Sequence, residues 1–147
     1  MTLSDIRDYT ASLSLAEHVY AGKLDAKQDR SIGVYNSKHN HAYRTALGGP
    51  SMESYGTKYV TFLVHWNKSQ KDTEKAAMAL FDALSRTRER PVNGQQIKFI
   101  QPLVSDPVDV GTDDANIYEM VIEAAVIYER RRDGEKDRSI PGIRESV

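Results

Sequence analysis

A run of eight strand-forming residues, from Tyr59 to Trp66, constrains the fold of this chain more than any other stretch. Alternate side chains of a β-strand point to opposite faces of its sheet. One face of this run is mixed and carries Tyr59, Thr61, Leu63 and His65. The other face is almost wholly apolar, with Val60, Phe62, Val64 and Trp66. The run therefore predicts a strand whose apolar face turns into the core.

An amphipathic helix is predicted directly after this strand. The segment Ser69-Gln70-Lys71-Asp72 has the form of a capping box, which satisfies backbone N–H groups at a helix start. Apolar side chains then follow at helical spacing on one stripe: Ala76, Ala77, Leu80, Phe81 and Leu84. Pro91 and Gly94 are expected to end this helix.

Shorter elements are predicted before the long strand. Thr2 can cap a helix over residues 3–13, because Asp5 follows three residues later and apolar residues share one face. Residues 17–23 and 31–35 read as two short strands, separated by a polar turn. Residues 36–54 contain asparagine, glycine and proline with little periodicity, which predicts a long loop.

The C-terminal third predicts two more strands and a tail. Residues 97–101 alternate as a strand that Pro102 interrupts or ends, and an acidic, glycine-containing turn is expected over 106–114. The last and longest strand is expected over 117–129, with one face made of Tyr118, Met120, Ile122, Ala124, Val126 and Tyr128. These elements predict an α+β fold, a mostly antiparallel sheet with helices packed on one face. One domain is expected over 1–130, followed by a charged, flexible tail over 131–147.

Length and composition exclude several classes of protein. The 147 residues are enough for one domain with a real core. A formal net charge of -1 argues against a general basic surface for nucleic acid. The absence of cysteine excludes disulfides, zinc–thiolate sites and thiol nucleophiles. No stretch approaches the roughly 18 apolar residues that span a bilayer, and the N-terminus lacks the apolar region of a secretory signal.

Residue patterns for catalysis are weak throughout the chain. His39 and His41 have ligand-like spacing but lack the three or four ligands of a usual metal site. The acidic turn lacks the alternating order of a calcium loop, and no glycine pair is followed by the Lys-Ser/Thr of a phosphate loop. A hydrolase that uses Asp109, Asp113 and His65 stays open only as a remote alternative. We therefore expect no enzyme, catalytic group, cofactor or metal.

Charge is segregated along the chain. From Phe99 to Glu129 there are seven acids and no Lys, Arg or His, whereas residues 1–98 carry 14 basic and 10 acidic side chains. This run of acids has three possible interpretations. It is a solvated face that arose by chance, or an acidic surface that pairs with a basic one around a ring. The third is a pore lining that repels DNA phosphates. The sequence leaves these three readings open.

Five segments in a fixed order resemble a known family: Val19-Tyr20-Ala21-Gly22-Lys23-Leu24-Asp25, Ser31-Ile32-Gly33-Val34-Tyr35, Leu63-Val64-His65-Trp66-Asn67-Lys68, Pro107-Val108-Asp109-Val110-Gly111-Thr112-Asp113-Asp114 and Ile117-Tyr118-Glu119-Met120-Val121-Ile122. Together they resemble the phage minor capsid proteins encoded by phages and prophages of Gram-positive bacteria. That family is similar in size and pattern to phage tail terminators. The resemblance covers roughly residues 1–130.

The resemblance implies a structural virion protein that acts through surfaces. It implies a ring, typically a hexamer, that caps the tail tube, stops its polymerisation and joins it to the head, or caps a tail-like bacteriocin. The implied partners are other copies of the chain, the major tail tube protein and head-completion or neck proteins, with DNA only as passing cargo and no membrane. The implied location is the head-proximal end of the tail in the virion, after assembly in the host cytoplasm.

The interface candidates come from the acidic turn and the tail: Asp106, Asp109, Asp113, Asp114, Arg130, Arg131, Arg132, Ile140 and Ile143. The alternatives are a head-completion or connector subunit on the portal side and a small cytoplasmic binding domain.

Overall fold

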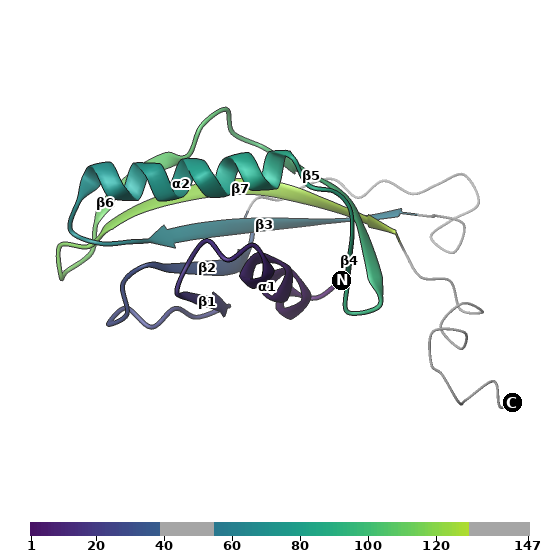
Figure 1. Cartoon of the computed structure of the whole chain (residues 1–147), viewed down its shortest axis with the longest axis horizontal. Helices are drawn as coiled ribbons and strands as arrows, with labels where there is room; N and C mark the ends of the chain where they lie inside the picture. The colour runs from purple at the N-terminus through teal and green to yellow at the C-terminus, as the bar shows by residue number, and fades with distance from the viewer. Residues whose placement is uncertain (39–54, 130–147) are drawn as a thin grey trace, which may run out of the picture.

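The computed structural model describes residues 1–38 and 55–129, which form two helices and seven strands. In chain order these are α1 (Leu3–Ser12), β1 (His18–Ala21), β2 (Ser31–Asn36), β3 (Tyr55–His65), α2 (Gln70–Ser85), β4 (Arg88–Val92), β5 (Gln95–Pro102), β6 (Val108–Thr112) and β7 (Tyr118–Glu129). The strands make one sheet along which α2 lies lengthwise (Figure 1). The fold is therefore α+β, as the sequence predicted.

The sheet has the order β1-β2-β3-β7-β5-β4, and β6 also pairs with β7. The antiparallel pair β3 and β7 forms its centre, with all eleven residues of β3 in register from Tyr55 opposite Glu129 to His65 opposite Glu119. All pairs are antiparallel except β1 with β2, which is parallel. The sheet is thus mixed rather than strictly antiparallel.

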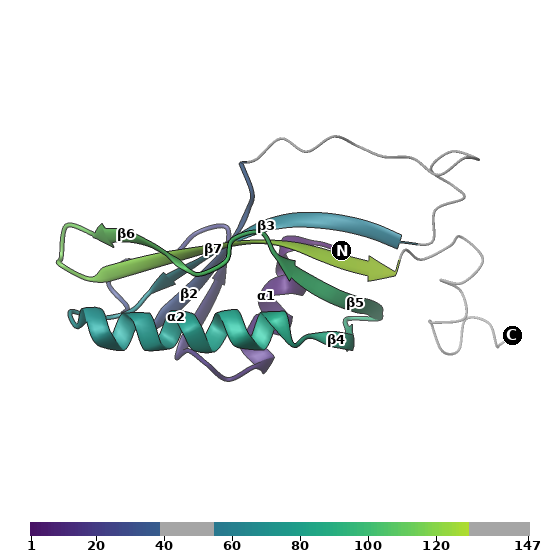
Figure 2. The ribbon, with the colours of Figure 1, turned by 90° about the horizontal axis from the view of Figure 1, so that it is seen from above.

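The core lies on the face of the sheet that the alternation predicted. Val60, Phe62 and Val64 of β3 are fully buried, and so are Ile122 and Val126 of β7. The helix stripe of α2 covers them with Ala77, Leu80 and Leu84. Helix α1 joins the same core through Ile6 and Tyr9, so both helices contribute to one cluster (Figure 2). Full burial of a side chain the size of leucine or phenylalanine contributes about 1.5–3 kcal/mol.

Both predicted helix starts are confirmed. The Thr2 side chain accepts the Asp5 N–H at 3.1 Å, and the Asp5 carboxylate accepts the Thr2 N–H at 2.8 Å, which completes a capping box. Ser69 caps α2 by accepting the Asp72 N–H at 3.2 Å. Neither described helix has the length and apolar character needed to cross a membrane.

The predicted end of the second helix was wrong. Helix α2 stops at Ser85, and the residues up to Pro91 enter β4, which pairs with β5 as a hairpin. The turn of that hairpin is Asn93-Gly94, where φ is 51° and 78°. Two successive residues with positive φ are typical of a type I′ turn, and Asn-Gly is the pair that favours it.

Three further differences concern the strands. Residues 108–112, expected as part of a turn, form strand β6. β1 and β2, expected as strands separated by a turn, pair in parallel, so the link between them carries the chain back along the sheet before β2 begins. A bulge between Ile97 and Phe99 turns Ile97 and Ile100 into the core and leaves Phe99 37% exposed, against the simple alternation predicted for this strand.

Candidate functional site

The acidic segment expected to be an interface forms the edge strand β6 and its flanking turns. β6 pairs with the first residues of β7, from Val108 opposite Val121 to Thr112 opposite Tyr118, with a bulge at Val110. All five residues of β6 are exposed, including Val108 at 47% and Val110 at 51%. An exposed edge strand offers unpaired backbone groups to another chain. This segment is therefore an open edge of the sheet rather than a closed site.

The four acids of the segment divide into two groups. Asp106, Asp109 and Asp114 are exposed, and none has a cationic side chain within ion-pair distance in the described ranges 1–38 and 55–129. The Asp109 carboxylate accepts the Gly111 N–H at 2.8 Å and lies 3.4 Å from the Gln70 amide nitrogen. These three acids leave β6 with unneutralised negative charge.

Asp113 holds the turn between β6 and β7. One of its carboxylate oxygens accepts the N–H groups of Ala115 and Ile117, both at 2.9 Å. The other oxygen lies 3.8 Å from Nδ1 of His65. Asp113 thus differs from the exposed acids, because both of its oxygens face groups of the same chain.

His65 is fully buried at the end of β3, between two carboxylates and a carbonyl. Its Nδ1 lies 2.7 Å from a carboxylate oxygen of Glu119, and its Nε2 lies 3.3 Å from the carbonyl oxygen of Ala26. Both ring nitrogens therefore face oxygen atoms of the same chain, so the buried ring has a polar partner at each position. The cluster ties together the end of β3, the turn of Asp113, the start of β7 and the link between β1 and β2.

This cluster is the arrangement closest to a metal or catalytic site in the described part of the chain. The ligand atoms of His65, Asp113 and Glu119 all lie within 4.8 Å of one another. The remote hydrolase alternative had combined His65 and Asp113 with Asp109, but the Asp109 carboxylate instead bonds within β6 and to α2. The hydrogen bond between His65 and Glu119 gives the cluster a structural role, because it joins the end of β3 to the start of β7. We call this contact the buried clamp.

Sequence reasoning missed Glu119 as the partner of His65. The two residues are directly opposite on β3 and β7, where side chains that bond across the strands stabilise a sheet. The pair can be found only from the register of β3 against β7, because its two residues are more than fifty positions apart in the sequence. Other residues considered from the sequence lie outside the described ranges: His39, His41, Arg130, Arg131, Arg132, Ile140 and Ile143. The loop from residue 39 to residue 54 also lies outside them.

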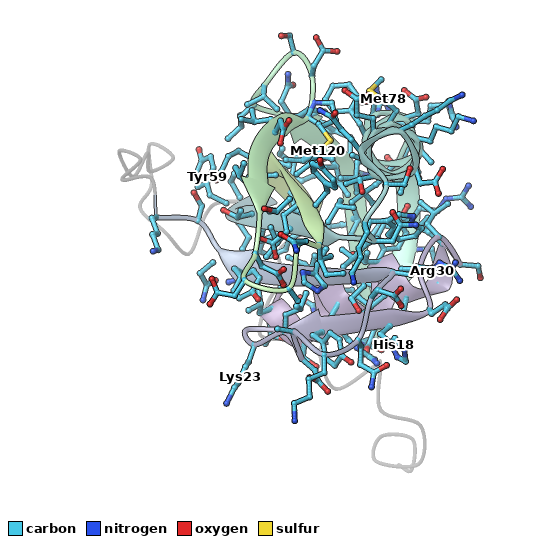
Figure 3. The ribbon with its side chains drawn as sticks, turned by 90° about the vertical axis from the view of Figure 1, so that its left-hand side faces the viewer. His18, Lys23, Arg30, Tyr59, Met78 and Met120 are labelled. Atoms are coloured by element: carbon cyan, nitrogen blue, oxygen red, sulfur yellow. The ribbon has the colours of Figure 1, made fainter. Side chains whose placement is uncertain are left out.

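A groove of about 670 Å³ runs between the outer side of α2 and the segment before β6. Its apolar part is formed by Met78, Ala79, Pro107 and Met120. Met78 is 39% exposed and lines the groove together with Met120, and Figure 3 shows both in its upper part. The groove adds apolar area beside the exposed valines of β6.

Comparison with known proteins gives one match. A family model described as bacteriophage tail terminator protein matches residues 3–130. No curated protein and no solved structure matches the chain.

Proposed function

The chain belongs to the bacteriophage tail terminator family, and on that premise we propose that it is a structural virion subunit rather than an enzyme. It forms a ring on the head-proximal end of the tail tube, stops tube polymerisation and joins the tail to the head. The observation that carries this proposal is the family match over residues 3–130, which includes every described helix and strand.

The character of the surface supports a function through interfaces. β6 leaves one strand edge open, and its two valines are each about half exposed. Exposed apolar edges promote pairing with other chains unless an assembly covers them. A subunit that ends a polymer needs one surface that docks on the tube and an opposite surface that does not repeat it.

The proposed partners follow from this role. Copies of the chain form the ring, a hexamer, and the major tail tube protein and the head-completion or neck proteins bind its two sides. DNA passes through as cargo. The proposed contact residues are the acids of the β6 segment and, in the tail, Arg130, Arg131, Arg132, Ile140 and Ile143. The protein assembles in the host cytoplasm and stays in the virion.

Deletion of the gene, followed by negative-stain microscopy of the particles, tests the proposal. Tails of uncontrolled length, or tails without heads, are the expected result. Normal tails beside heads that have lost their DNA would instead indicate a head-completion subunit. A purified chain that stays monomeric at every concentration and does not slow polymerising tube protein would refute the proposal.

A further inference from the structure

The exposed acids around β6 and the arginines around β4 are separated in space. β6 pairs with β7 over Tyr118–Val121, whereas β5 pairs with β7 over residues 124–129. β6 and the hairpin of β4 and β5 therefore lie at opposite ends of the longest strand. Figures 1 and 2 agree, with β6 at one end of the molecule and β4 at the other.

We call the first of these ends the acidic end, defined by Asp106, Asp109, Asp114, Val108 and Val110. Its three acids have no cationic partner in the described ranges, and its two valines are about half exposed. On the rim of the adjoining groove, Lys71 and Lys75 are balanced by Glu74 and Asp82 of the same helix, and Asp106 adds a negative charge. This end therefore combines apolar area with net negative charge.

We call the other end the arginine end, defined by Arg86, Arg88, Arg90 and Phe99. All four are exposed, and none of the three arginines has a carboxylate within ion-pair distance in the described ranges. Of the acids near this end, Glu89 pairs with Lys98 at 3.0 Å. Asp5, which accepts from Asn93 and Gln95, and Glu129, opposite Gln96, are outnumbered by the three arginines. The Arg88 guanidinium lies over the Phe99 ring, 5.8 Å from its centre, and donates to the Ser85 and Thr87 carbonyls.

The two ends complement each other through side chains rather than through a shared strand ladder. β4 is also an edge strand, but Pro91 has no N–H to donate, and Glu89 has a φ of 50° that interrupts regular extension. Arginine fits carboxylates through two parallel hydrogen bonds. The valines of the acidic end and Phe99 of the arginine end supply apolar area beside these charged contacts.

We infer that copies of this chain associate head to tail, with the acidic end of one copy bound to the arginine end of the next. Two acidic ends repel each other, and so do two arginine ends, which disfavours a symmetric dimer. A contact between different surfaces closes into a ring when the rotation between copies allows it. The inference rests on the proposed ring and names the surfaces that build it.

Two charge-reversed variants test this pairing. The first carries Asp109→Arg with Asp114→Arg, and the second carries Arg88→Glu with Arg90→Glu. Each variant has two ends of the same sign, so we expect its self-association, measured by analytical ultracentrifugation, to weaken at least about tenfold. An equimolar mixture should assemble again, because the first variant then offers two basic ends and the second two acidic ends.

The matched control is Lys23→Glu with Lys38→Glu, two exposed residues that belong to neither end: Lys23 follows β1, and Lys38 lies two residues beyond β2. Figure 3 shows Lys23 on the far side of the molecule from Met78. This control should associate like the unaltered chain, and circular dichroism should give all variants the same thermal transition. Rings that survive either reversal, or a mixture that does not assemble, would overturn the pairing. An unaltered chain that never associates would instead refute the ring itself.

Discussion

Replacing Glu119 by alanine should destabilise the protein far more than removing an exposed ion pair of similar geometry. Glu119 lies 2.7 Å from His65, whose ring is fully buried, while the Glu119 side chain is 21% exposed. Leaving a buried polar group without its hydrogen-bond partner costs about 1–3 kcal/mol. Asp113 lies 3.8 Å from the same nitrogen and offers partial compensation. We therefore expect a loss of about 2 kcal/mol, which corresponds to roughly 4–8 °C in Tm.

The assay is urea unfolding at neutral pH, with the concentration of protein held equal for all variants. Trp66 is the only tryptophan and follows His65 directly, so its fluorescence reports on this part of the fold. The control is Glu17→Ala, which removes the pair with Arg30 at 3.0 Å, where both side chains are more than half exposed. An exposed pair of this kind contributes about 0.5 kcal/mol or less. Equal losses for the two variants would refute the buried clamp.

Three further outcomes are expected from the fold. Partial burial opposes ionisation of Asp5, but hydrogen bonds from Thr2, Asn93 and Gln95 outweigh it and lower the pKa of Asp5 to about 2 from the ordinary 3.8. Asp5→Ala should therefore lower the free energy of unfolding by about 1 kcal/mol above pH 4, after allowance for solvent screening. Acid unfolding curves should show this difference fade as the pH drops from 3.8 towards 2. Leu80→Ala should lower the free energy of unfolding in urea by about 2–5 kcal/mol, because Leu80 is fully buried. Met78→Ala, on the exposed side of the same helix, should lower it by less than about 1 kcal/mol. Similar losses for the two variants would contradict the burial of α2. Gly94→Val places a branched residue at a φ of 78° and should lower the free energy of unfolding by at least about 1 kcal/mol, seen as a lower midpoint of thermal unfolding. An unchanged midpoint would contradict the turn conformation.

The sequence by itself determined the elements whose signals are local. The alternation of β3 predicted its buried face, because the period of two places Val60, Phe62 and Val64 on one side. The caps at Thr2 and Ser69 predicted both helix starts, since each side chain bonds a backbone group three residues away. The order of short motifs also indicated the tail terminator family, which the match over residues 3–130 confirms.

Some missed features had a local signal that was overlooked. Asn93-Gly94 is a strong hairpin signal, and it would have separated β4 from the end of α2. The alternation of Val108 and Val110 with polar neighbours likewise favours a strand, but the acids around it favoured a turn. In both segments the apolar content was too low for the run to stand out from its polar surroundings.

Only the tertiary structure decided which strands pair and which charges meet. The parallel pairing of β1 with β2, the position of β6 on the free half of β7 and the contact of His65 with Glu119 all join residues that local patterns do not relate. The same holds for the separation of the acidic and arginine ends, because a charge run along the chain acquires a place in space only when its strands pair. The spacing of buried side chains along a helix or strand is set by backbone geometry within a few residues. Strand order and register are set by the burial of one shared core, to which segments distant in the sequence contribute together.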